Sequence, residues 1–311
     1  MTRRLTRRRF LAVSAAAMTL PYGANAKPAV ARWRGIALGA NASMTLVGLE
    51  DAAAREIFTA VEAEIARLEA IFSLHRGDSA LSRLNQSGKL RAPPPELLEL
   101  IALSGALHRA TNGAFDPTIQ PLWQLHARRA AEGLRPRHDE IAEAQRRSGW
   151  RYLRSDTRSL SFDRPGMALT FNGIAQGYIA DRVAALLRAR GLTDVLIDMG
   201  EIAALGRRPD GAAWRAGIAL PEGGVVREVT LGERALATSA PHGTLLDRAG
   251  EVGHILDPRS GRPAGRWQLV SVAAGRAALA DGLSTAFCLM DEEAIATILA
   301  AYPDATLEAL L

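Results

Sequence analysis

The chain has 311 residues, and its 38 lysines and arginines exceed its 33 acidic residues by five. Five arginines and no acid lie within the first 26 residues, at Arg3, Arg4, Arg7, Arg8 and Arg9. The rest of the chain has no net charge, which argues against a basic nucleic-acid-binding face. A composition of 48% hydrophobic and 23% charged residues is that of a globular protein. The single Cys288 excludes an intramolecular disulfide framework and any multi-cysteine metal site.

The N-terminal segment has the order of a secretory signal peptide. Arginines are followed by an apolar run at 12–20 and by the small-residue cleavage site Ala24-Asn-Ala26. Thr6-Arg-Arg-Arg-Phe-Leu11 matches the twin-arginine form of such signals. A basic surface helix is the alternative, although such helices rarely end in a cleavage site. We expect residues 1–26 to be removed and residues 27–311 to form one soluble periplasmic domain. No later apolar run approaches the roughly 18 residues that span a bilayer.

The first half of the mature chain is predicted to be mainly helical. A strand interrupted by Gly39 is expected at 36–47, and a long helix with a periodic apolar stripe runs from Asp51 through Phe72. A polar loop follows at 73–90. Further helices are expected from the three prolines at 93–95 through His108, and at 138–148.

Strands and helices mix in the second half. A hairpin is expected at Ser159–Phe162 and Met167–Phe171, and a helix from Ile174 to Arg190 that Gly191 ends. Further strands are expected at 195–199, 213–219, 226–231, 252–256 and 268–274, and late helices at 277–289 and 291–301. Because strands and helices do not alternate steadily, we predict an α+β fold with mixed sheets and packed helices.

Two glycines open the helix that follows the predicted hairpin, in Asn172-Gly-Ile-Ala-Gln-Gly-Tyr178. Free amides at such a helix start can face a phosphate, since glycine leaves room for the anion. Spacing alone favours the simpler alternative, a tight turn with close packing.

A second motif, Ala280-Asp-Gly-Leu-Ser-Thr-Ala286, places Asp281 and Thr285 on one helical face with Ser284 beside them. Such oxygen ligands suit a hard cation such as Mg²⁺. The alternative is a helix cap at Asp281 with two hydroxyls bonded to the backbone.

The segment His254-Ile-Leu-Asp-Pro258 combines a candidate base with a carboxylate. His254 can accept a proton while Asp257 orients it or activates a hydroxyl. An Asp-Pro turn with a satisfied histidine is the alternative. Likewise Asn112-Gly-Ala-Phe-Asp-Pro-Thr118 can be a simple helix stop and turn.

The order of these motifs, together with Ile197-Asp-Met-Gly200 and Ala237-Thr-Ser239, resembles the ApbE family of FAD:protein FMN transferases. The resemblance extends from about Leu38 to Leu289. The leader and the Asn-Gly-Ile-Ala-Gln-Gly variant are most similar to the NosX branch, which is associated with nitrous oxide reduction.

The resemblance implies an ApbE-like, T-fold-like architecture and a Mg²⁺-dependent enzyme. Such an enzyme cleaves FAD, attaches FMN through a phosphoester to a Ser or Thr of an acceptor flavoprotein, and releases AMP. An acceptor with an FMN-binding domain, such as a membrane-bound NosR-like protein, is the implied partner.

The resemblance also assigns roles to residues. His254 is the implied base, with Asp257 in support. The implied metal residues are Gly173, Asp281, Ser284 and Thr285. The implied FAD-pocket residues are Leu38, His75, Ala114, Phe115, Asp116, Thr170, Gln176 and Ile255.

The chain departs from the family pattern mainly at positions of the flavin pocket. Leu38 replaces a usual Met, His75 a usual aromatic residue, and Thr170 and Gln176 a usual Asp and Lys. These changes motivate two alternatives to transfer: a flavin-binding accessory or assembly factor without catalysis for a periplasmic respiratory system, and an FAD pyrophosphatase that releases free FMN.

Overall fold

Seven strands form one sheet in the computed structural model, which describes residues 28–221, 223–247, 250 and 252–311. The predicted signal peptide and Lys27 lie outside these residues. The strand order is β1 (Val30–Ala37), β2 (Ala40–Val47), β6 (Val195–Asp198), β7 (Ile202–Leu205), β10 (Ala235–Ser239), β11 (Val270–Ala274) and β12 (Thr306–Leu310). Every pair of neighbouring strands is antiparallel, so this sheet is antiparallel and not mixed as predicted. The predicted α+β class is confirmed.

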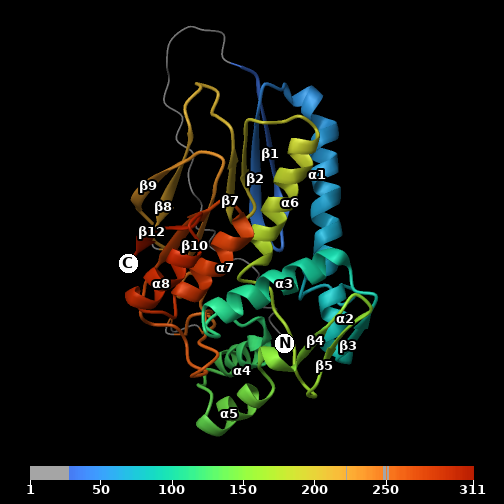
Figure 1. Cartoon of the computed structure of the whole chain (residues 1–311), viewed down its shortest axis with the longest axis vertical. Coiled ribbons are helices and arrows are strands. Elements are labelled where there is room, and N and C mark those ends of the chain that lie inside the picture. The colour runs from blue at the N-terminus through green and yellow to red at the C-terminus, as the bar shows by residue number, and fades with distance from the viewer. Residues whose placement is uncertain (1–27, 222, 248–249, 251) are drawn as a thin grey trace, which may run out of the picture.

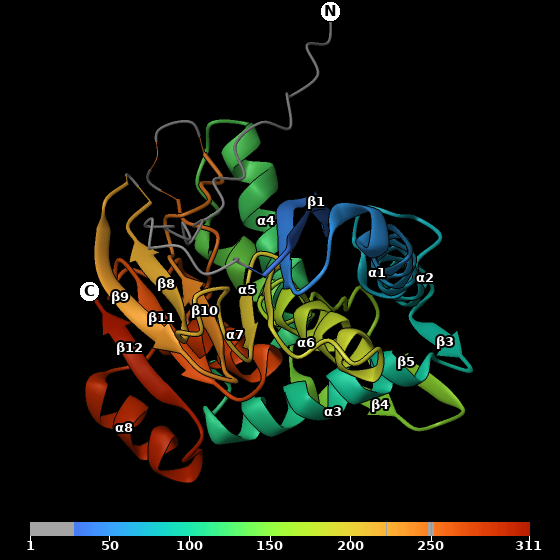
Figure 2. The same ribbon diagram turned by 90° about the horizontal axis from the view of Figure 1, so that it is seen from above.

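The two faces of the sheet are covered differently (Figure 1, Figure 2). Helices α1 (Asp51–Phe72), α6 (Ala175–Ala189) and α7 (Ala277–Phe287) bury the main core on one face. A hairpin of β8 (Trp214–Ala219) and β9 (Val225–Leu231) covers the other face, where Trp214, Leu231 and Leu236 are buried together. Helix α8 (Glu292–Ala301) leads into β12. No helix in the described part of the chain is long and apolar enough to cross a membrane.

A second group of elements lies beyond one end of α1 (Figure 1). It contains α2 (Ala80–Ser87), α3 (Pro95–Ala110) and a small sheet of β3 (Lys89–Arg91), β5 (Ser159–Phe162) and β4 (Leu153–Ser155). The short turns η1 (Pro117–Ile119) and η2 (Trp150–Tyr152) flank the helix pair α4 (Gln120–Ala131) and α5 (His138–Arg146).

The predicted helices are confirmed to within a few residues at their ends. The strand predicted at 36–47 is instead the second half of a hairpin, because Leu38 and Gly39 have positive φ values of 48° and 84° and form its two-residue turn. The predicted polar loop at 73–90 contains α2. This helix begins after Ser79, whose hydroxyl accepts from the Ser82 amide. It was not predicted because a helix of only two turns is too short to show an apolar period.

Two predicted strands are not formed. Met167–Phe171 does not pair with β5, because the Asn85 side chain bonds both backbone groups of Leu169. Residues 252–256 make only isolated bridges, and the His254 amide donates to Pro241 instead of to a strand partner. The elements that were not predicted are the eight-residue strand β1, the shorter strands β3, β4, β7, β10 and β12, and helix α4.

Candidate active site

Asp281 lies at the contact between α6 and α7. Its side chain is buried, and its Oδ2 accepts a hydrogen bond from the Gly177 amide at 3.1 Å. A Cβ added at Gly177 would lie 2.4 Å from the Ala277 carbonyl oxygen, so the close-packing alternative is correct for this glycine. The capping alternative for Asp281 is correct in part: its carboxylate accepts from a first-turn amide of α6, whereas the first amides of α7, at Ala277 and Ala278, donate to Asp181.

The other predicted metal residues lie around Asp281. Thr285 follows it by one helical turn, and a Cβ added at Gly173 would lie 2.8 Å from Thr285 Oγ1. Ser239 Oγ of β10 lies 2.8 Å from Ser284 Oγ and 3.3 Å from Thr285 Oγ1. The structure therefore brings Gly173, Asp281, Ser284 and Thr285 together. Ser284 also donates to the Asp281 carbonyl, which gives its hydroxyl a structural role.

The electrostatics of this site fit a hard cation. Asp281 is 3% exposed, and burial raises the pKa of its carboxyl to about 7. A second buried acid, Glu201, accepts from the Thr238 amide at 3.2 Å; burial and the charge of Asp281 raise its pKa well above the usual value. Among the described residues no ion pair reaches either acid, and buried charge without a counterion is costly.

A cation here would bind mainly oxygens other than carboxylates. Within the residues that the structure describes, no three His, Cys, Asp or Glu side chains form a metal-binding group. Asp281 and Thr285 offer a carboxylate and a hydroxyl oxygen, and the main chain of Gly173, which lies against Thr285, would add a carbonyl oxygen. That donor set suits Mg²⁺, which keeps several ligand positions for water or phosphate.

The imidazole of His254 is oriented by main-chain carbonyls. Its Nδ1 lies 3.2 Å from the Pro241 oxygen and 3.1 Å from the Thr244 oxygen. Both partners only accept, so Nδ1 carries the proton and Nε2 presents its lone pair. Burial lowers the His254 pKa, which keeps the ring neutral. A neutral imidazole with an available Nε2 can act as a general base.

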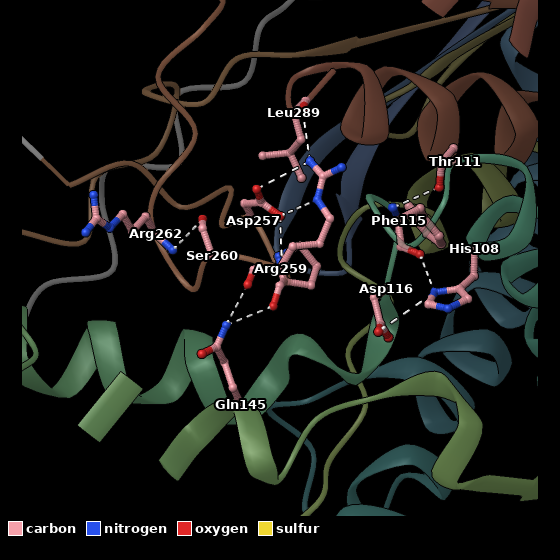
Figure 3. Close-up of polar contacts among 11 residues, drawn as sticks. His108, Thr111, Phe115, Asp116, Gln145, Asp257, Arg259, Ser260, Arg262 and Leu289 are labelled. Carbon is pink, nitrogen blue, oxygen red and sulfur yellow. Dashed lines mark hydrogen bonds and ion pairs between the residues drawn. The ribbon is translucent and has the colours of Figure 1, made fainter. Parts of the chain in front are cut away.

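The prediction that Asp257 orients His254 is wrong, because the Asp257 carboxylate bonds Arg259 instead. Its Oδ1 accepts from the Arg259 amide and from Arg259 Nε, both at 2.9 Å. Arg259 Nη2 in turn donates to the Leu289 carbonyl at 3.1 Å, just beyond α7 (Figure 3). Asp257 therefore orients Arg259, which ties this turn to the end of α7. The Asp-Pro-turn alternative describes Asp257 correctly.

Three predicted FAD-pocket residues, Ala114, Phe115 and Asp116, lie in the loop after α3. Asp116 Oδ1 accepts from the amide and hydroxyl of Thr118 at 2.8 and 2.6 Å, and its Oδ2 lies 3.8 Å from His108 Nδ1 (Figure 3). Burial raises the Asp116 pKa. The Thr170 amide donates to the Pro117 carbonyl, which brings Thr170 to the same loop.

The other predicted pocket residues fall into two groups. Leu38 and His75 lie near the C-terminal end of α1: the Leu38 amide donates to Glu69 Oε1, and exposed His75 follows the helix by three residues. Gln176 lies in the first turn of α6 against Gly200, and buried Ile255 follows His254. The predicted pocket therefore draws on segments that are far apart in the sequence.

Sequence reasoning missed four residues around this site: Asp181, Glu201, Ser239 and Arg259. Two of them could have been predicted from the motifs, since Glu201 directly follows Ile-Asp-Met-Gly and Ser239 ends Ala-Thr-Ser. Their neighbours come from other elements, so spacing along the chain gave no sign of the contacts.

Comparison with known proteins identifies the family. The profile of the ApbE family matches residues 38–311. The chain belongs to the ApbE family.

Relatives and solved structures agree with this assignment. The chain is 32% identical over 231 residues to an FAD:protein FMN transferase of Vibrio cholerae, covering 71% of this chain and 69% of the relative. It is 32% identical to that of Treponema pallidum, covering 81% and 75%. Among solved structures, the flavin transferase ApbE of Vibrio cholerae has a TM-score of 0.80 at 27% identity, covering 90% and 93% of the two chains. The Pseudomonas stutzeri flavinyl transferase ApbE has a TM-score of 0.77 at 31% identity, covering 89% of each.

Proposed function

We propose that this protein is a Mg²⁺-dependent FAD:protein FMN transferase. The observation that carries the proposal is the oxygen cluster at the α6–α7 contact, where buried Asp281 lies with Thr285 and Gly173 and has no cationic side chain as partner among the described residues. Family membership and the activity named for its relatives support the same reaction.

The reaction joins an acceptor hydroxyl to the FMN half of FAD. The oxygen of an acceptor Ser or Thr attacks the phosphorus on the FMN side of the pyrophosphate, forming a new O–P bond. The bridging O–P bond breaks, and AMP leaves with the former bridging oxygen. The hydroxyl proton passes to Nε2 of His254, which the Nδ1 contacts to Pro241 and Thr244 leave available.

Asp281, Thr285 and the Gly173 carbonyl would hold Mg²⁺, and Ser284 would support the helix through its bond to the Asp281 carbonyl. When bound, Mg²⁺ neutralises charge that develops on the pyrophosphate during attack. The Gly177 amide fixes Asp281 Oδ2 before FAD arrives, so the carboxylate requires little rearrangement.

The flavin and adenosine parts of FAD would contact the predicted pocket. Phe115 and Asp116 are fixed by Thr111 and Thr118, whose hydroxyls bond the Phe115 amide and Asp116 Oδ1 respectively. Such bonds hold a binding loop in place before the substrate enters.

We further infer where the enzyme acts and on what. The predicted twin-arginine leader favours export and action in the periplasm. The acceptor is a flavoprotein with an FMN-binding domain, and a membrane-bound NosR-like protein of nitrous oxide reduction is the acceptor to test first.

A gel assay tests the proposal. Mature protein, FAD, Mg²⁺ and an acceptor domain are mixed, denatured and separated, and flavin fluorescence is recorded at the acceptor band. We expect a fluorescent band that requires Mg²⁺. An unlabelled acceptor, in a reaction where an established family enzyme labels the same domain, contradicts the proposal. Bound FAD without labelling would favour the accessory factor, and free FMN without labelling would favour the pyrophosphatase.

A further inference from the structure

The segment that carries His254 folds as a hairpin, here called the 254–264 hairpin. The Asp257 amide donates to Arg262, the Gly261 amide to Asp257, and the Ala264 amide to Ile255. Leu256 and Pro263 form a bridge across it. His254 opens the hairpin, and the turn at its tip lies at the opposite end.

The tip of this hairpin is bound by the helix pair α4–α5, here called the α4–α5 platform. Gln145 Nε2 donates to the carbonyls of Pro258 and Arg259 at 3.3 and 3.0 Å (Figure 3). His126 Nε2 lies 2.9 Å from the Gly261 carbonyl, and burial lowers the His126 pKa, so the neutral ring donates this bond.

Apolar packing reinforces these bonds. Leu256 is buried with Leu122, Leu125 and Ala144 in a small cluster that is separate from the main core. Gly261 fits tightly: its φ is 68°, and an added Cβ would lie 2.4 Å from Ile141 Cγ2. Leu256 therefore fills an apolar surface that the two helices would otherwise leave incomplete.

The platform is also tied to the predicted FAD pocket. Its chain enters directly after Asp116 and returns at Gly149, whose amide donates to Thr118 Oγ1 at 2.7 Å. The same hydroxyl donates to Asp116 Oδ1. Both ends of the platform thus meet at a pocket residue, while its two helices hold the tip of the 254–264 hairpin.

We propose that the α4–α5 platform positions His254 relative to bound FAD, with Gln145 as a positioning residue for the transfer step. The proposal rests on the proposed function for its substrate and base. Gln145 Nε2 donates to main-chain oxygens at the hairpin tip, so Gln145 would act on His254 through the hairpin. A small displacement of His254 would slow the reaction strongly.

A double-mutant cycle in single-turnover transfer tests this role. Gln145→Ala and His254→Ala are made singly and together, with Gln124→Ala, an exposed residue of α4, as the control. We expect Gln145→Ala to slow transfer roughly tenfold with His254 present and less than about twofold in the His254→Ala background. FAD binding and the Mg²⁺ concentration for half-maximal rate should not change, and Gln124→Ala should match the wild type.

Equal slowing by Gln145→Ala in both backgrounds overturns the positioning role, because a general loss of structure would not depend on His254. Slow transfer by His254→Ala combined with a wild-type rate for Gln145→Ala overturns this proposal alone. A wild-type rate for His254→Ala contradicts the base assignment in the proposed function.

Hydrogen exchange tests the docking without any activity. We expect Gln145→Ala, but not Gln124→Ala, to speed amide exchange in the peptide that spans 254–264. Unchanged exchange in that peptide overturns the proposal even if transfer is never observed.

Discussion

Asp281 is a buried acid without a basic partner among the described residues, and acidic residues are rarely buried unless they are paired. It is fully enclosed, yet its carboxylate is bonded to one main-chain amide and, among the described residues, to no basic side chain. Burying a carboxylate without a charged partner destabilises the folded protein, and a bound cation offsets that destabilisation. Such a residue is costly for the metal-free protein and useful in the metal-bound one.

Asp281→Asn separates these two effects. The amide oxygen of Asn can still accept from Gly177, so we expect the metal-free variant to unfold at the same temperature as the wild type or a higher one. Transfer should fall by at least about 100-fold, because a metal ion supplies several kcal/mol of charge stabilisation. Thermal unfolding and single-turnover assays measure the two quantities. A variant that transfers FMN at the wild-type rate contradicts the metal assignment.

The contribution of Asp116 to folding stability should change with pH in the opposite direction to that of an exposed, ion-paired acid. Burial raises its pKa in the folded state, so its contribution to stability is complete below the unfolded pKa and is lost as pH rises through the folded pKa. Asp116→Asn cannot ionise. We expect the melting temperature of the variant, relative to the wild type, to increase as the pH rises above about 4, the ordinary pKa of an aspartate in an unfolded chain.

Asp78→Asn is the control for this measurement. Exposed Asp78 is paired with Arg76, which lowers its pKa, so its small contribution is present at neutral pH and lost as pH falls. If the melting-temperature difference between Asp116→Asn and the wild type does not change with pH, the assignment of a buried carboxyl with a raised pKa is contradicted. Weaker FAD binding by the same variant would place Asp116 in the pocket.

At the scale of elements, the position of Asp281 depends on how closely α6 and α7 approach. Gly177 permits that approach, since the space for a side chain is filled by the Ala277 carbonyl. Asp181 fixes the start of α7 from the same face of α6. The metal residues are therefore placed by helix packing, and a change in this contact should affect stability and transfer together.

Gly177→Ala tests this dependence. Its new methyl group would overlap the α7 backbone, which cannot rotate away, so we expect a loss of about 1–3 kcal/mol in the free energy of unfolding. A weaker response to Mg²⁺ in transfer should accompany it. Gly232→Ala is the matched control, because nothing lies within 4 Å of an added Cβ there. Equal unfolding free energies for the two variants would show that the contact is not tight.

Elements differed in how well the sequence predicted them. The long helices α1, α3 and α6 were predictable, because apolar periodicity, prolines or Gly191 mark them. Several short strands, among them β3, β4 and β7, were not predicted because three or four residues carry too few positions for a period. Segment 167–171 looked like a strand, but Asn85, which lies 84 residues before Leu169, occupies the backbone groups a strand would pair.

The candidate site shows the same division. The residue types and their order led to the prediction of Asp281, Thr285 and His254 as site residues. The sequence could not show that Asp257 bonds Arg259, or that carbonyls of Pro241 and Thr244 orient His254, because both sets of contacts depend on the folded loops.

At the scale of the whole molecule, the excess of basic charge lies in the predicted leader and not in the described domain. The basic residues of a twin-arginine signal act through a receptor, so their identity matters more than their charge. The same five arginines that make the chain basic thus support a periplasmic location.

Replacing Arg7 and Arg8 by Lys tests the export proposal at constant charge. We expect this variant to remain uncleaved in the cytoplasm, whereas the matched Arg3→Lys, Arg4→Lys variant should be exported and begin at Lys27. Cell fractionation with N-terminal sequencing of the recovered protein distinguishes them. Equal export of the two variants contradicts the twin-arginine route.

The stoichiometry of transfer tests the central proposal most directly. Intact-mass spectrometry of an acceptor domain is combined with AMP quantification after reaction with FAD and Mg²⁺, for wild type and Asp281→Asn. We predict one FMN phosphoester per acceptor, one AMP released for each, and at least about 100-fold slower formation of both products with Asp281→Asn. Free FMN and AMP with an unmodified acceptor, or bound FAD with no AMP, would contradict it.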